Sequence, residues 1–396
     1  MKKITILYSI LFLLIVYLPS SLMIAYRLHI TSKTFQVFKL EGYFESHKRP
    51  SFSKHSYANG NYQKDFEKWL NSRISFRGFY IRLYNQIQFS IFKLSNRIIG
   101  KNDDIFEIGY INTECGFISD FSNHENYQKL NEYVNHLENI QNKLRNIGKY
   151  FIFYITPSKA TQNFNNIPLK YRLKKPKEYK APYYYLKKLL SETSINYLDS
   201  RDFFSTDGTP DFYTTGIHWA RPIEQRVSQA IVENLSSQSN QKLPKIILNE
   251  LTLSNVPIKR DADVFNLANI FEKPQGTYYE YEAETKAELD SLKPNFMIQG
   301  GSFAEGFYNY DYADFTKNSY KFFYNRLFLK KDEAIIKITK WEDVDFTEIL
   351  DNVDFVVVEL NEAVIPNFSN GFVEYLDSFL DRYIAKQPLQ DVNNGF

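Results

Sequence analysis

The stretch "NFMIQGGSF", residues 295–303, joins a short apolar run to two glycines and a serine. A run of this length that ends at turn-forming residues is typical of a buried strand. A serine in this place is most often only the N-cap of a helix that follows a turn. The alternative is a nucleophile held at the carboxyl end of a strand, and the rest of the chain has to decide between the two.

Apolar strands and amphipathic helices alternate from about residue 125 to the end of the chain. The expected strands are residues 149–157, 194–200, 295–299, 333–341 and 353–362, and the expected helices are residues 125–148, 181–193, 222–237 and 372–386. Apolar strands between helices favour a parallel sheet that is covered on both faces. The sequence therefore predicts an α/β fold, a parallel sheet flanked by helices.

The N-terminus carries an uncharged run of 23 residues, 4–26, behind Lys2 and Lys3. About 20 apolar residues are enough to cross a bilayer, and the positive end stays in the cytoplasm. We expect residues 1–26 to form a transmembrane anchor that leaves the rest of the chain outside the cytoplasm. A cleaved signal peptide is the alternative, but Pro19 and Met23 make poor residues before a cleavage site.

The rest of the chain divides by composition. Residues 27–60 are polar and turn-rich, which predicts a stalk, and residues 61–122 are expected to form a helical segment that packs on a catalytic domain. The catalytic domain is predicted to span residues 123–396. Residues 238–290 are mixed and polar, which indicates an insertion or connection within that domain.

The composition also excludes several classes of function. Lys and Arg (48) nearly balance Asp and Glu (46), so no basic field predicts nucleic-acid binding. One cysteine and six scattered histidines give no disulfide and no metal-ligand spacing. We therefore expect neither a metal nor another cofactor.

Polar residues gather where the expected strands end, and ligands of parallel sheets bind at that edge. Each has an ordinary structural interpretation, as a turn, a packed ring or an ion pair. The residues in question are Lys159 after residues 149–157, Gly300, Gly301 and Ser302 after residues 295–299, Glu359, Asn361 and Glu362 in residues 353–362, and His218 and Trp219 before a helix.

Together these residues indicate acyl transfer. A serine needs a base to remove its proton, and His218 on a neighbouring loop can provide it for Ser302. Backbone N–H groups near Gly300 and Gly301 can hold an oxyanion, because glycine lets a substrate approach the backbone closely.

At this point the sequence resembles the AlgJ/AlgX-like polysaccharide O-acetyltransferase family, whose members have a circularly permuted SGNH-hydrolase-like domain. The segments that carry the resemblance are short, but their number, order and spacing agree. They are YQKDFEKWLNSRISFRGFYIRLYNQI after the anchor, IIGKNDDIFEIGYI, FIFYITPSKATQNFNNIPLKY, TTGIHW where the family has D-x-H-W, and QGGSF where it has G-D-S-F.

The resemblance implies Ser302 as nucleophile and His218 as base, with Gly300, Gly301, Lys159, Trp219 and Asn361 around the oxyanion and the substrate. It implies acetyl transfer to a hydroxyl of an exported cell-surface polysaccharide. It also implies anchoring in the inner membrane of a bacterium, a periplasmic catalytic domain, and an MBOAT-type membrane acyltransferase as the acetyl donor partner.

Two glycines depart from the family pattern. Gly216 stands where the family's aspartate orients the histidine, and Gly301 stands at the aspartate of G-D-S-F. We therefore expect His218 to act without a carboxylate from its own motif, as part of a Ser–His pair. The candidates for a substitute acid are Asp202, Asp207, Asp211, Glu359 and Glu362.

Two other functions stay open. A carbohydrate acetyl esterase would use the same residues, with water in place of the sugar hydroxyl. A degenerate glycan-binding or scaffold protein would keep the fold without activity; the two glycines favour it, while Ser302 and His218 oppose it.

Overall fold

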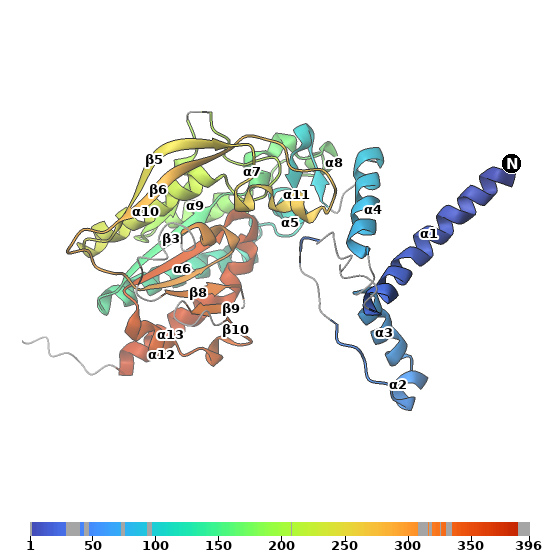
Figure 1. Ribbon diagram of the computed structural model, residues 1–396. Coiled ribbons are helices and arrows are strands. Elements are labelled where there is room, and N and C mark those ends of the chain that lie inside the picture. The colour runs from blue at the N-terminus through green and yellow to red at the C-terminus, as the bar shows by residue number, and fades with distance from the viewer. Residues whose placement is uncertain are drawn as a thin grey trace, which may run out of the picture. The chain divides into compact units, whose positions relative to one another are not determined.

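A computed structural model describes residues 2–28, 40–42, 47–72, 76–92, 97–206, 208–307, 316, 319–324, 326–329 and 335–386 (Figure 1). The chain divides into two compact units, residues 1–97 with 264–274 and residues 98–263 with 275–396. The second unit thus begins well before the predicted boundary at residue 123, because Phe106 and Ile111 pack in a common cluster with Ala160 and Ile167.

The first unit is helical, with α1 (Lys2–Arg27), α2 (Lys54–Ala58), α3 (Asn61–Asn71) and α4 (Arg77–Phe92). The uncharged run expected as an anchor lies in α1. Within the described residues, no helix has the length and apolarity that a membrane span requires.

The second unit is built on a seven-stranded sheet in the order β10-β9-β8-β7-β11-β3-β4. Its strands are β3 (Tyr150–Thr156), β4 (Tyr197–Asp199), β7 (Phe296–Gly300), β8 (Ser319–Phe323), β9 (Arg326–Leu329), β10 (Ile335–Lys337) and β11 (Phe355–Asn361). The five strands from β8 to β4 are parallel, so the carboxyl ends of β7, β11 and β3 lie at one edge.

The prediction of a wholly parallel sheet is wrong for β9 and β10, at the edge of the sheet opposite β4. There β9 pairs antiparallel with β8, and β10 pairs antiparallel with β9. The short connection around Tyr324 allows only this arrangement, because a parallel pair needs a much longer crossover.

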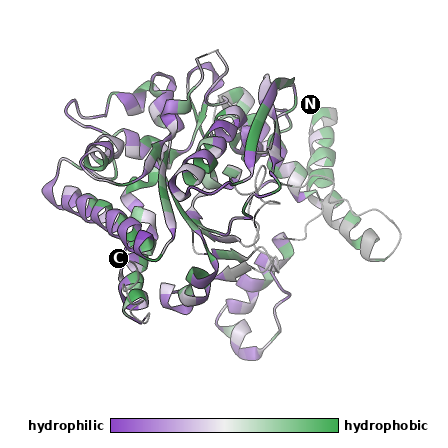
Figure 2. Cartoon of the chain, turned by 90° about the vertical axis from the view of Figure 1, so that its left-hand side faces the viewer, coloured by the Kyte–Doolittle hydropathy of each residue, from purple (hydrophilic) through white to green (hydrophobic). Residues whose placement is uncertain are grey.

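Helices cover both faces of the sheet, as the apolar strands predicted. They include α6 (His124–Asn146), α9 (Pro182–Ser191), α10 (Arg221–Ser239), α12 (Phe346–Asn352) and α13 (Phe372–Lys386). Side chains alternate along β3: Phe151 and Phe153 pack with α6, α9, α12 and α13, whereas Ile152 and Tyr154 pack with α10. Figure 2 shows the resulting pattern, hydrophobic strands between helices of mixed hydropathy.

The predicted insertion, residues 238–290, contains ordered structure. An antiparallel pair of β5 (Lys245–Ser254) and β6 (Tyr278–Lys286) packs on α10. Between these strands lie η4 (Lys259–Ala262) and the start of α11 (Asp263–Leu267). This connection, residues 255–277, brings the side chain of Asp263 to the candidate site.

Candidate active site

Ser302, His218 and Asp263 form a hydrogen-bonded chain. Ser302 begins η5 (Ser302–Ala304), separated from the end of β7 by one residue, and its Oγ lies 2.6 Å from His218 Nε2. His218 Nδ1 lies 2.7 Å from Asp263 Oδ2. An ionised carboxylate only accepts hydrogen bonds, so Nδ1 carries the imidazole hydrogen and Nε2 is left to accept from the serine hydroxyl. This is the geometry that a serine nucleophile, a base and an orienting acid require.

The expectation of a Ser–His pair without a third member is therefore wrong, and the acid, Asp263, is not among the five candidates named from the sequence. Gly216 explains why the acid comes from elsewhere in the chain. A Cβ on Gly216 would lie 2.8 Å from the carbonyl oxygen of Asp261 and 2.9 Å from that of Arg260. The space of a side chain at residue 216 is thus filled by the backbone of η4, which delivers Asp263 to the histidine.

Two hydrogen bonds join the segment that carries Asp263 to the loop that holds His218. Thr215 Oγ1 donates to the carbonyl oxygen of Asp261 at 2.7 Å. The N–H of Ile217 donates to Asp263 Oδ1 at 3.1 Å. Both oxygens of Asp263 therefore accept hydrogen bonds from the loop that holds His218, which fixes the carboxylate relative to the imidazole.

Arg260 joins the same segment to the nucleophile turn. Its guanidinium donates to the carbonyl oxygen of Ser302 and to the buried carboxylate of Glu224 on α10. Burial alone would raise the pKa of Glu224, but the guanidinium groups of Arg260 and Arg221 outweigh it and hold that pKa below its ordinary value. Glu224 is thus an anion that anchors Arg260.

The acids proposed from the sequence lie elsewhere or have other partners. Glu362 pairs with Arg201, with Oε2 of the carboxylate 2.7 Å from Nη2 of the guanidinium. Asp211 accepts from the N–H of Ser205 at 3.0 Å. Asp202 is exposed in η3 (Ser200–Phe203), and Asp207 lies outside the described residues.

Glu359 is the exception, because it lies beside the nucleophile. It is 2% exposed, its Oε2 accepts from the N–H of Gly301 at 2.7 Å, and its Oε1 accepts from Thr156 Oγ1. Burial raises the pKa of Glu359 to about 6, although these hydrogen bonds oppose the rise. Glu359 therefore contacts the turn that carries Ser302, and the contacts described for His218 Nδ1 go to Asp263.

Three residues expected at the oxyanion or the substrate have structural contacts. The Gly301 N–H is already donated to Glu359, and Asn361 Nδ2 donates to the carbonyl oxygen of Pro157 at 2.9 Å. A Cβ on Gly300 would lie 2.8 Å from the Cβ of Glu359, so glycine is needed there for packing. These contacts correct the expectation that the Gly301 N–H and the Asn361 amide await an oxyanion.

Lys159 and Trp219 also have structural roles. Lys159 is 1% exposed and pairs with Asp104 at 2.6 Å. Its ammonium group donates to the carbonyl oxygens of Tyr213 and Gly216, both at 2.7 Å, so it fastens the loop that carries His218 to the end of β3. Trp219 is buried and packs edge-on against the ring of Phe303. Neither Lys159 nor Trp219 lines the cavity beside Ser302.

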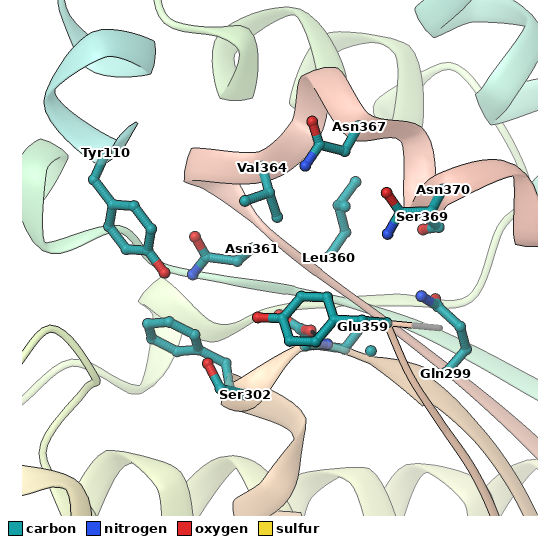
Figure 3. Close-up of a pocket in the computed structure, with 14 residues that line it drawn as sticks. Tyr110, Gln299, Ser302, Glu359, Leu360, Asn361, Val364, Asn367, Ser369 and Asn370 are labelled. Carbon is teal, nitrogen blue, oxygen red and sulfur yellow. Dashed lines mark hydrogen bonds between the residues drawn. The ribbon is translucent and has the colours of Figure 1, made fainter. Parts of the chain in front are cut away.

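A cavity of about 50 Å³ opens beside Ser302 (Figure 3). Its walls come from Tyr110 on α5 (Ile108–Glu114), from the ends of β7 and β11, and from η9 (Glu362–Gly371). Burial raises the pKa of Tyr110 well above its ordinary value, so its phenol is neutral at physiological pH. A cavity of this size next to the serine suits a small group rather than a long acyl chain.

Several solved structures are similar to this chain. The chain is similar to the O-acetyltransferase domain of Pseudomonas putida AlgJ. The two share 15% sequence identity, the match covers 72% of this chain and 99% of that domain, and the TM-score is 0.43. AlgX of Pseudomonas aeruginosa shares 13% identity over 71% of this chain and 67% of its own, with a TM-score of 0.39.

PatB1 of Bacillus cereus is also similar, with 10% identity over 60% of this chain and 91% of its own and a TM-score of 0.37. No family model and no curated protein matches the chain. These TM-scores lie below 0.5, so the similarity carries no argument about function.

Proposed function

We propose that this protein is an O-acetyltransferase that moves an acetyl group to a hydroxyl of a polysaccharide. The observation that carries the proposal is His218 between two partners, with Ser302 Oγ at 2.6 Å from one ring nitrogen and Asp263 Oδ2 at 2.7 Å from the other. A scaffold protein without activity would not require these three side chains to lie within hydrogen-bonding distance of one another.

The chemistry proceeds in two halves. In the first, Ser302 Oγ attacks the carbonyl carbon of the donor ester while its proton moves to His218 Nε2, and the leaving alkoxide then takes that proton. In the second, an acceptor hydroxyl gives its proton to Nε2 and attacks the acyl carbon, and the proton passes to Ser302 Oγ as the ester bond to the serine breaks. Asp263 stays ionised and stabilises the imidazolium that forms in each half.

An acetyl esterase is the alternative, and it shares the first half of this reaction. The two activities differ in whether water or a sugar hydroxyl attacks the acyl-enzyme. Partition of the acetyl group between acetate and an added acceptor distinguishes them.

Location and partner are further parts of the proposal. The uncharged run at residues 4–26 behind Lys2 and Lys3 is its basis for an N-terminal anchor and a domain outside the cytoplasm. An MBOAT-type membrane acyltransferase as donor partner follows from the sequence resemblance alone. Protease treatment of spheroplasts tests the location: the domain should be digested while the membrane stays intact, and a protected domain would contradict it.

The nucleophile can be tested with a serine-directed fluorophosphonate probe. The wild-type protein should be labelled and Ser302→Ala should not, because the alanine variant lacks the attacking oxygen. Ser369→Ala is a suitable control, since the hydroxyl of Ser369 lines the same cavity but bonds to Tyr133. Equal labelling of Ser302→Ala and wild type would refute the assignment.

A further inference from the structure

The cavity beside Ser302 has an unusual charge. Among the described residues that line it there is no lysine and no arginine, and Glu359 is the one acidic side chain. The Glu359 carboxylate is buried, and its hydrogen-bond partners, Thr156 and the N–H of Gly301, are uncharged. Arg260 is near enough to lower the pKa of Glu359, but it does not line the cavity, and its guanidinium is bonded to Glu224 and to the carbonyl oxygen of Ser302. An anionic group entering this cavity would lose its water without a cation among the described residues of the cavity wall, and it would approach a like charge.

Gln299 supplies a second observation, because its side-chain carbonyl is unsatisfied. The residue is 7% exposed and lines the cavity, and its Oε1 is buried without a hydrogen-bond partner among the described residues. A buried carbonyl oxygen is normally paired, and an orphan of this kind requires an explanation. A bound group with an O–H or N–H would satisfy it.

The wall opposite the sheet is a strained turn. Three successive residues of η9, Phe368, Ser369 and Asn370, have φ of 44°, 51° and 54°, the left-handed region that residues other than glycine rarely adopt. Two hydrogen bonds hold the turn in place. One joins the hydroxyl groups of Tyr133 and Ser369, 2.7 Å between oxygens, and the other runs from Trp341 Nε1 to the carbonyl oxygen of Asn370, 3.2 Å. Backbone strain of this kind gathers at ligand sites, and here it lines the cavity.

We infer that this cavity belongs to the subsite for the acceptor, and that it takes the reacting edge of an uncharged sugar unit, whose hydroxyl or amide N–H donates to Gln299 Oε1. The inference rests on the proposed function and adds the class of glycan: a neutral hexose or N-acetylhexosamine polymer rather than a polyuronate. An acetyl group has no hydrogen-bond donor, so it cannot be the group that Gln299 awaits. In Figure 3, Gln299 and Asn370 lie on one side of the cavity and Tyr110 on the other.

The test uses p-nitrophenyl acetate as donor and two matched acceptors, cellotriose and a trimer of β-1,4-linked glucuronate. The purified full-length protein is incubated with each, and acetylated trimer and free acetate are both quantified. Acetylation of Ser302 is followed by peptide mass spectrometry in the same samples. We expect kcat/KM for cellotriose to exceed that for the glucuronate trimer at least tenfold.

Variants test the two side chains. Gln299→Leu should lower the ratio of acetyl transfer to hydrolysis with cellotriose roughly tenfold, because one acceptor hydrogen bond is lost. It should melt no lower than wild type, since an orphaned carbonyl is removed. Gln141→Leu is the matched control: Gln141 is buried but bonds to the N–H of Asn196 at 2.6 Å and the carbonyl oxygen of Ser194 at 2.9 Å, so it should melt lower and keep the ratio. Glu359→Gln should raise the use of the glucuronate trimer relative to cellotriose.

Three results would overturn the inference: equal or preferred use of the glucuronate trimer, an unchanged transfer ratio in Gln299→Leu, or acetylated Ser302 with no transfer to cellotriose. A failure of p-nitrophenyl acetate to acetylate Ser302 is a different result. It refutes the proposed function itself, and the inference falls with it.

Discussion

Replacing Asp263 with asparagine should impair acyl transfer more than any other change of an acid in this protein. Asp263 Oδ1 accepts from the N–H of Ile217, and Oδ2 accepts from His218 Nδ1. An asparagine that keeps the first contact through its carbonyl oxygen turns its NH₂ group toward Nδ1. Nδ1 must then accept, Nε2 carries the hydrogen, and the imidazole can no longer take the proton of Ser302.

The size of the effect follows from this change of tautomer. In a serine protease the same substitution lowers kcat by about 10⁴, which is about 5 kcal/mol at 1.36 kcal/mol per factor of ten. The acid of a serine protease is buried, whereas 21% of the Asp263 side chain is exposed, so water can replace part of the lost interaction. We therefore expect a loss of about 10²- to 10⁴-fold.

The assay is the release of p-nitrophenol from p-nitrophenyl acetate, with the acylation rate taken from the initial burst. Asp211→Asn is the control, because Asp211 belongs to the same region of sequence but bonds to Ser205. Circular dichroism checks that each variant is folded. If Asp263→Asn acylates within tenfold of wild type, His218 does not depend on this carboxylate and the assignment of the acid is wrong.

Three further predictions concern the framework. Glu359 has a folded-state pKa of about 6 against 4.5 in the unfolded chain, so the free energy of unfolding should fall by about 2 kcal/mol as pH rises from below 4.5 to above 6. Glu359→Gln has no carboxyl group to titrate, so urea denaturation should show it to be more stable than wild type above pH 6 but not below pH 4.5. An equal difference in the free energy of unfolding at both pH values would contradict the raised pKa of Glu359. Gly216→Ala should displace the segment that carries Asp263 and lower the acylation rate by about 10² or more in the burst assay, since the acid is then misplaced; near-normal acylation would show that the segment has room for a methyl group. Lys159→Met should leave the carboxylate of Asp104 buried without its cation and lower the free energy of unfolding by about 3–5 kcal/mol, while Lys170→Met, a matched change outside the ion pair, should alter it little; similar losses in both would argue against the buried pair.

The sequence predicted the central strands and the pair Ser302 and His218, because each signal was local. Apolar runs between helices marked β3, β7 and β11, and glycines after β7 marked the turn at Ser302. Parallel strands place their carboxyl ends at one edge, which is why residues far apart in sequence could be grouped correctly.

Asp263 could not be predicted in the same way. It lies in a polar region with no periodicity, and its approach to His218 depends on how the connection between β5 and β6 folds back over Gly216. The signal that existed was the missing side chain itself: a glycine in the place of an acid leaves a space, and here a distant segment fills it. Strand β9 was missed, and the antiparallel direction of β10, expected as a strand at residues 333–341, was not predicted, because a hairpin at a sheet edge reverses direction within a few residues.

Mass spectrometry of the acyl-enzyme tests the central claim most directly. The wild-type protein is mixed with p-nitrophenyl acetate, quenched in acid during the burst and digested. We expect the peptide containing Ser302 to gain the mass of one acetyl group in the wild type and to gain none in Ser302→Ala or His218→Ala. An acetyl group on another residue, or an unmodified Ser302 while p-nitrophenol is released, would contradict it.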